Sequence, residues 1–219
     1  TFTWQLIPIN NETCQKDEEM EQFINHYRKE TDKKYDRIVT RFTNCLTHPV
    51  RNQETALGNL MADILCDSLG IDLMLMGSGA IRSYELGPVV HYQDLVECLP
   101  YDEAVYMLQV NGTQLERMLR RILREEAFEG EHTEFYQFSH GMQIIWSRGQ
   151  QEFETLTLNG KALDQQKLYT IALSKFHYMN IQNFLNISLE EIKINAPPRV
   201  LATSYRDIVE EYMMMNPHL

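Results

Sequence analysis

Hydrophobic side chains recur at helical spacing in two long stretches of the chain. The first stretch predicts a helix over residues 54–69, which Gly70 would end as a left-handed C′ residue. The second helix is predicted to start at the capping box Thr113-Gln114-Leu115-Glu116, just after the turn Asn111-Gly112, and to run to about Ala127. The inward-facing residues of the first helix are Leu57, Leu60, Met61, Ile64, Leu65 and Leu69.

The first 35 residues have a different pattern. Residues 1–9, TFTWQLIPI, alternate between apolar and polar positions and predict a strand without an obvious partner. Residues 16–34 predict a highly charged helix with a thin apolar stripe. Such a helix suits a connector between two domains, and it equally suits a surface helix packed on its own domain. The stripe consists of Met20, Phe23, Ile24 and Tyr27.

Strand-like stretches and helices are mixed along the rest of the chain. Asn159-Gly160 is a strong hairpin-turn signal, and it predicts that residues 153–158 pair with residues 168–173. A last helix is predicted from Ser204, with Asp207 at its N3 position. This order favours an α+β fold, a mixed β-sheet with packed helices, over a regular βαβ array. Further strands are predicted at residues 37–42, 71–76, 104–110 and 142–146.

Charge and composition narrow the possible partners. The net charge of −11 argues against a nucleic-acid polymer, which needs a basic face, but a small anion needs only two or three local cations. No apolar run is long enough to predict a membrane span. The four cysteines have no CxxC or metal spacing, which leans weakly toward a reducing compartment.

The stretch Met76–Arg82, MGSGAIR, is the strongest candidate for chemistry. Its small residues would let a ligand approach the backbone, and Arg82 would offer a bidentate fork to an anion. The simpler interpretation is a tight turn with a solvated arginine. Gly77-Ser78-Gly79 is not a GxSxG elbow, so a Ser78 nucleophile is disfavoured, and the seven histidines show no metal-binding spacing.

Two aromatic residues follow predicted elements at places where a flat ring could be sandwiched. Tyr101 follows Pro100 after an apolar run, and Phe176 follows the strand predicted at 168–173. Aromatic pairs of this kind stack on bases in nucleic-acid-binding proteins. From position alone, both residues are more simply explained as members of the core.

Six stretches, in order, resemble the C-terminal domain of the 5'-nucleotidase family. Residues 57–63 resemble its NLGNLxAD helix, residues 76–82 its NGGGIR turn, and residues 99–101 its LPF motif. Residues 110–115 resemble its ltGxxL motif, residues 137–141 its QxSG motif, and residues 169–176 the strand and aromatic before its GGDGF motif. The order and spacing hold from about residue 36 to residue 215.

The resemblance implies that part of a two-domain enzyme is absent from this chain. Residues 1–35 would be the last strand of an N-terminal metallophosphoesterase domain plus a connector helix, and residues 36–219 the substrate-binding domain. The chain begins TFTW, without an initiator Met, which agrees with a piece of a longer protein. The two divalent metal ions and the catalytic His-Asp pair would belong to the missing domain. The resemblance therefore implies no cofactor and no hydrolase activity for this chain alone.

The family's binding residues carry over unevenly. The resemblance assigns Arg51 and Arg82 to the phosphate and Tyr101 and Phe176 to base stacking. The asparagine that helps to read the base is replaced by Gly77, and the aspartate that binds the ribose hydroxyls by Gln182, in a loop that has lost two glycines.

These replacements leave two functions open. The first is the recognition half of a 5'-nucleotidase-like phosphohydrolase, which binds a nucleotide or related phosphate ester and works with its own N-terminal domain. The second is a non-catalytic interaction domain whose pocket has drifted and is filled by its own side chains, such as Tyr178 or Met179. The family is often exported or displayed at the cell surface, while the cysteines also fit the cytoplasm.

Overall fold

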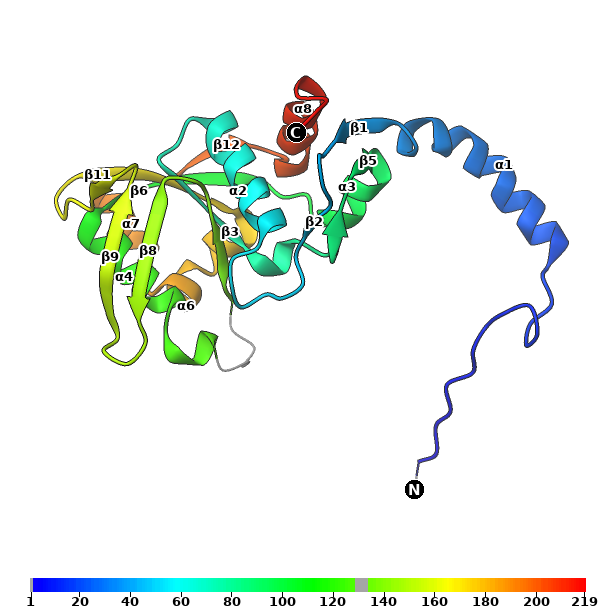
Figure 1. Cartoon of the computed structure of the whole chain (residues 1–219), viewed down its shortest axis with the longest axis horizontal. Helices are drawn as coiled ribbons and strands as arrows, with labels where there is room; N and C mark the ends of the chain where they lie inside the picture. Colours follow the sequence, from blue (N-terminus) through cyan, green and yellow to red (C-terminus); the bar gives the residue numbers. More distant parts are fainter. Residues whose placement is uncertain (1, 129–133) are drawn as a thin grey trace. The chain divides into compact units, whose positions relative to one another are not determined.

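The computed structural model describes residues 2–128 and 134–219 of the chain. The chain divides into two compact units, Thr1–Arg37 and Ile38–Leu219 (Figure 1). In the described part, no helix has both the length and the apolar character needed to cross a membrane.

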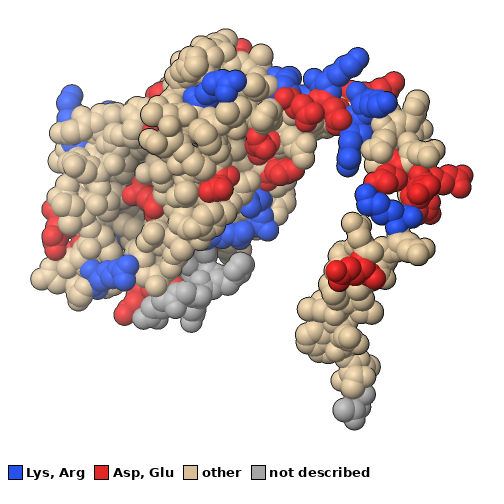
Figure 2. Space-filling model, turned by 45° about the vertical axis from the view of Figure 1, so that its right-hand side comes forward, with Lys and Arg blue, Asp and Glu red and all other residues tan. Residues whose placement is uncertain are grey.

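The first unit is built around the charged helix α1 (Glu18–Tyr35). Asp17 caps it by accepting a hydrogen bond from the Met20 N–H, and acidic side chains fill the first turn while lysines fill the last. Figure 2 shows acidic and basic side chains side by side along it. None of its residues is buried, so its apolar stripe is exposed within this unit. The described residues 2–9 form no strand in this structure, and their assignment as the last strand of an N-terminal domain stays a prediction.

The second unit is organised by a five-stranded mixed sheet in the order β12-β6-β11-β3-β7. β11 pairs in parallel with β3, and the other neighbours pair antiparallel. The inner strand β3, between β11 and β7, is buried at every residue, as a strand covered on both faces must be. The strands are β3 (Leu73–Gly77), β6 (Val105–Asn111), β7 (Tyr136–Phe138), β11 (Leu168–Ser174) and β12 (Arg199–Ala202).

Helices cover both faces of this sheet. Leu73 and Leu75 of β3 join a core cluster with Leu115 and Met118, which lie on helix α4. Helix α2 also packs on β3 and on β7 (Figure 1). The two halves of the core thus meet across β3, and the α+β fold predicted from the sequence is confirmed. The helices are α2 (Ala56–Leu69), α3 (Tyr92–Cys98), α4 (Gly112–Ile122), α5 (Lys175–Met179), α6 (Ile181–Leu185), α7 (Leu189–Asn195) and α8 (Tyr205–Met215).

The smaller sheets complete the unit. Asn159 and Gly160 both have positive φ, and they join β9 to the short strand β10. The predicted pairing of residues 153–158 with 168–173 is therefore wrong, because β11 instead fills the place between β6 and β3 in the central sheet. The other strands are β1 (Ile38–Arg41), β2 (Leu46–Thr47), β4 (Glu85–Leu86), β5 (Val89–His91), β8 (Met142–Ser147), β9 (Glu152–Leu158) and β10 (Lys161–Ala162).

The predicted capping residues agree with the structure for α2 and α8 but not for α4. Gly70 ends α2 in the left-handed conformation, and the Ser204 hydroxyl accepts from the Asp207 N–H to start α8, as predicted. The predicted cap of α4 at Thr113 is wrong. The capping box is instead formed by Asn111 and Gln114, whose side chains each accept from the other's backbone N–H.

Candidate functional site

The site begins where the buried strand β3 turns sharply. The 3-10 turn η1 (Ser78–Ala80) follows β3 directly, and the Ser78 N–H donates to the Phe135 carbonyl at 2.8 Å. The Arg82 N–H donates to the Cys98 carbonyl at 2.9 Å, and its guanidinium lies 3.4 Å from the Gly79 carbonyl. The turn is therefore fixed at both ends, and it directs Arg82 away from the core. Ser78 is buried with its hydroxyl bonded to Gln137, which is not the position of an exposed nucleophile.

A buried glutamine joins this turn to the loop that carries Arg51. The Gln137 side chain is completely buried on β7. Its Nε2 donates to the Gln53 carbonyl at 2.9 Å and to the Ser78 hydroxyl, and its Oε1 accepts from the Thr55 N–H at 2.8 Å. The fully hydrogen-bonded side chain of Gln137 thus joins β7 to the loop at residues 53–55 and to the turn at Ser78.

His48 makes a second link between the same loop and the turn. Its Nδ1 lies 2.7 Å from the Thr55 hydroxyl, and its Nε2 lies 3.1 Å from the Ser78 carbonyl. Because a carbonyl only accepts, Nε2 carries a proton. Burial lowers the pKa of His48, and the positive charge of Arg51 lowers it further.

Two aromatic side chains stand beside the turn with their rings partly in solvent. Tyr101 is 53% exposed and Phe176 is 49% exposed. The Phe176 N–H donates to the Glu103 carboxylate at 2.9 Å, and the Arg82 guanidinium carbon lies 5.7 Å from the centre of the Tyr101 ring. These contacts hold the two rings and the arginine without burying them.

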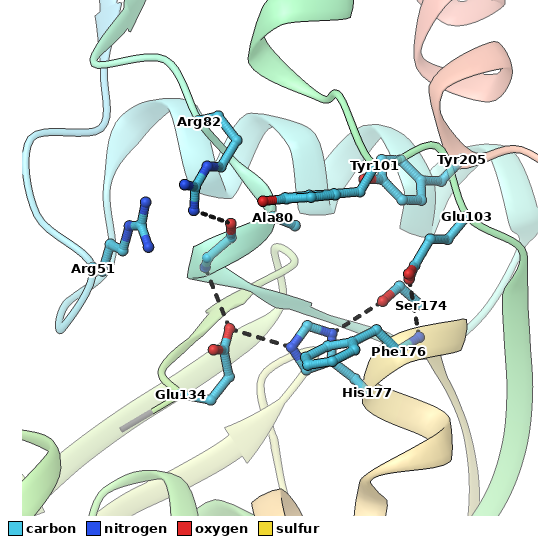
Figure 3. Close-up of a pocket in the computed structure, with 11 residues that line it drawn as sticks. Arg51, Ala80, Arg82, Tyr101, Glu103, Glu134, Ser174, Phe176, His177 and Tyr205 are labelled. Atoms are coloured by element: carbon cyan, nitrogen blue, oxygen red, sulfur yellow. Dashed lines mark hydrogen bonds and ion pairs between the residues drawn. The ribbon is translucent and has the colours of Figure 1, made fainter. Parts of the chain in front are cut away.

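The two arginines and the two aromatic rings line one pocket of about 360 Å³ (Figure 3). Arg51, Arg82, Tyr101 and Phe176 all line it, so the four residues that the sequence analysis singled out for binding converge in space. Figure 3 shows the two arginines on one side of the pocket and the aromatic rings on the other. The remaining lining residues are Gly79, Ala80, Glu103, Glu134, Ser174, His177 and Tyr205.

A buried histidine forms the floor of this pocket. His177 is 3% exposed, its Nδ1 lies 3.0 Å from the Ser174 hydroxyl, and its Nε2 lies 3.2 Å from a Glu134 carboxylate oxygen. The same oxygen accepts from the Gly79 N–H at 3.3 Å. The Nε2–Glu134 contact is an ion-pair distance without hydrogen-bond geometry, and the Ser174 hydroxyl can either donate to Nδ1 or accept from it. Ser174, His177 and Glu134 thus lie in contact with one another along the pocket (Figure 3).

The glycines of the turn leave room for this chain. A Cβ on Gly77 would overlap Cε1 and Nε2 of His177 and lie 2.6 Å from the Glu134 carboxylate. A Cβ on Gly79 would lie 3.3 Å from the same carboxylate oxygen. The small residues of MGSGAIR therefore accommodate the His177–Glu134 pair as well as the tight backbone turn.

The sequence of the chain and its fold were compared with known proteins. The sequence model of the 5'-nucleotidase C-terminal domain matches residues 35–187. The chain belongs to this family. A comparison with curated protein sequences finds no significant match.

Solved structures of family members and of other enzymes share the fold at low sequence identity. A 5'-nucleotidase precursor from Thermus thermophilus matches 95% of this chain with a TM-score of 0.72 and 16% identity. The NAD nucleotidase of Haemophilus influenzae matches 93% with a TM-score of 0.69 and 15% identity. A sulfate thiohydrolase from Thermus thermophilus matches 92% with a TM-score of 0.68 and 13% identity. This chain covers only 42%, 40% and 36% of these three proteins, respectively.

Within this 5'-nucleotidase C-terminal domain, two positions that differ from the family motifs lie outside the pocket lining. Gly77 ends β3, and its missing side chain would point into space that His177 occupies. Gln182 is an exposed residue of α6. Tyr178 stacks on Tyr106 with ring centres 4.2 Å apart, and Met179 is 63% exposed, so neither of these two lines the pocket.

Several lining residues of the domain were not singled out by the sequence analysis. Glu134 precedes β7, while Ser174 and His177 flank the start of α5, and no short motif links these positions. Their proximity arises from the order of the central sheet, in which β3 lies between β7 and β11. In the described part of the chain, no group of three His, Cys, Asp or Glu side chains is arranged to hold a metal ion.

Proposed function

We propose that this chain is the substrate-recognition domain of a 5'-nucleotidase-like phosphohydrolase and that its pocket binds a nucleotide or a related phosphate ester. The proposal is supported above all by one observation. Two half-exposed aromatic rings and two guanidinium groups, contributed by four separate segments, line the same pocket. Isolated solvated arginines and core aromatics would not be expected to gather in this way.

The chemistry of each group suits one part of such a ligand. Tyr101 and Phe176 would stack on the planar base, for which an aromatic contact contributes about 1–3 kcal/mol in nucleic-acid complexes. Arg51 and Arg82 would bind the phosphate through charge-assisted, bidentate hydrogen bonds. The net charge of −11 makes these local cations more important, since the rest of the surface repels an anion.

Hydrolysis would require the part of the protein that this chain does not include. By its family, the chain would act with an N-terminal metallophosphoesterase domain whose two divalent metal ions activate the attacking water. In this scheme residues 1–35 include the connector, with α1 as its helix. The chain by itself would bind substrate without metal-dependent turnover.

A non-catalytic interaction domain is the second candidate function. It is favoured by the exposed position of Gln182 and by the replacement of the base-reading side chain with Gly77. It requires a pocket closed by the protein's own side chains. Because the pocket stays open and neither Tyr178 nor Met179 fills it, the binding function is better supported.

Calorimetric titration of the chain with AMP, adenosine and a sugar phosphate tests the binding proposal. Arg82→Ala should weaken AMP binding at least about tenfold, because a hydrogen bond to a charged group contributes about 1.5–3 kcal/mol. The same substitution should leave adenosine binding nearly unchanged, because adenosine has no phosphate.

Two matched controls come from outside the pocket. Arg199→Ala removes an exposed arginine of β12, and Tyr84→Ala removes a tyrosine that is 65% exposed. Both should leave AMP affinity unchanged, whereas Tyr101→Ala should weaken AMP and adenosine alike. The absence of binding for all three ligands would refute the proposal, and so would equal losses in Arg82→Ala and Arg199→Ala.

A further inference from the structure

The Glu134 carboxylate is a hydrogen-bond acceptor of the pocket that two groups of the protein contact. It is held by the His177 ring at 3.2 Å and by the Gly79 N–H at 3.3 Å, and both contacts use the same oxygen, Oε1. Among the residues described, no hydrogen bond or ion pair engages its other oxygen. The carboxylate side chain is 21% exposed, and it lines the same pocket as the two rings (Figure 3).

The surroundings of Glu134 show that its position is built into the fold. His177 is buried between the rings of Tyr136, Phe176 and Phe184, with ring centres 5.0–5.7 Å away. Ser174 fixes the ring orientation through Nδ1. The imidazole can therefore move little, and the Glu134 oxygen lies beside a ring of fixed orientation.

A fixed carboxylate discriminates between flat rings by the hydrogen-bonding pattern at their edge. It has acceptor lone pairs only, so Oε2 can accept from a ring N–H, and a neighbouring N–H donor adds a second contact to the same carboxylate. The edge of a 2-amino-6-oxopurine presents such a pair, N1–H and the 2-amino group. Adenine presents an acceptor at N1, which would face the carboxylate without a proton between them. A ligand that presents an acceptor in place of these donors gains no hydrogen bond from the carboxylate and sets two lone pairs against each other, which disfavours it.

We propose that Glu134, oriented by His177 and Ser174, makes this pocket selective for a 2-amino-6-oxopurine nucleotide over an adenine nucleotide. The inference rests on the proposed function, since it concerns the ring that Tyr101 and Phe176 would hold. Glu134 contacts the ligand directly, and His177 and Ser174 act as positioning residues. Gly77 is then explained as the residue that leaves space for this acceptor.

The test compares the dissociation constants of GMP, IMP, AMP and 2'-deoxy-GMP for the full chain by calorimetry. GMP should bind at least about tenfold more tightly than AMP, and IMP, which keeps N1–H but lacks the amino group, should fall between them. 2'-Deoxy-GMP should bind like GMP, because the proposed contact is to the base. Equal affinities for GMP and AMP would overturn the proposal. A loss for 2'-deoxy-GMP as large as that for AMP would also overturn it, since the acceptor would then be reading the sugar.

Glu134→Gln provides the second measurement. The amide keeps the size of the side chain but has one donor and one acceptor, so the GMP-to-AMP preference should fall toward unity or reverse. Glu103→Gln is the matched control, because Glu103 lines the same pocket but holds the Phe176 N–H, and its loss should weaken both nucleotides alike. An unchanged preference in Glu134→Gln would refute the assignment.

The proposal stays testable if Glu134→Gln does not fold, because the four-ligand series needs only the unmodified chain. Failure of the whole series to bind would refute the proposed function together with this inference. Binding of all four nucleotides with equal affinity would refute this inference alone.

Discussion

Replacement of Gln137 by methionine should destabilise the domain and weaken ligand binding together. Methionine matches the shape of glutamine but leaves the Thr55 N–H, the Gln53 carbonyl and the Ser78 hydroxyl without their partner. Each buried polar group left unpaired costs about 1–3 kcal/mol, so two to three such groups predict a loss of about 2–9 kcal/mol in the free energy of unfolding. Urea denaturation followed by circular dichroism measures this loss.

Gln143→Met is the matched control for this substitution. Gln143 is exposed on β8, so its replacement should change the free energy of unfolding by less than about 0.5 kcal/mol. Because Gln137 joins the Arg51 loop to the turn before Arg82, Gln137→Met should also weaken AMP binding under conditions where the chain is still folded. Equal stabilities of the two variants would refute the view that Gln137 organises the site.

Three further results are expected. Gly77→Ala should destabilise the domain by about 1–3 kcal/mol, because its Cβ would overlap His177. Gly149→Ala is the control and should not destabilise the domain, since nothing lies within 4 Å of a Cβ at that position. Thermal unfolding of the two variants measures the difference. His48 has a lowered pKa in the folded chain, so the unfolded chain binds its proton first as the pH drops. Its contribution to stability should be complete above about pH 6.5 and decline below it, and His48→Gln, which cannot titrate, should show a flatter dependence in urea denaturation between about pH 7.5 and 5.5. Ser174→Ala should reduce the GMP-to-AMP preference with little change in the melting temperature, whereas a purely structural Ser174 would change the melting temperature and leave the preference intact.

Local signals predicted much of the fold. The helical spacing before Gly70 and the Ser204 cap predicted α2 and α8 with nearly correct ends, because a cap or a left-handed residue acts within one turn of chain. Asn159-Gly160 correctly predicted a turn. It did not predict the partner strand, because β10 is only two residues long while β11 pairs in the central sheet, where Tyr169, Ile171 and Leu173 are buried.

The candidate site shows where sequence patterns stop being informative. Arg51, Arg82, Tyr101 and Phe176 could be singled out because each lies in or near a stretch that resembles a family motif, and the structure brings them to one pocket. Whether they bind a ligand stays a prediction. Glu134 and His177 could not be predicted from a motif, because they are 43 residues apart in the sequence. They become neighbours only because β7 and β11 lie on either side of β3 in the sheet.

A crystal structure of the chain grown with a saturating concentration of GMP tests the central claim most directly. The account predicts the base between the rings of Tyr101 and Phe176, with the phosphate within hydrogen-bonding distance of the Arg51 and Arg82 guanidinium groups. Nucleotide bound elsewhere on the chain, or a pocket that holds only water at that concentration, would contradict it.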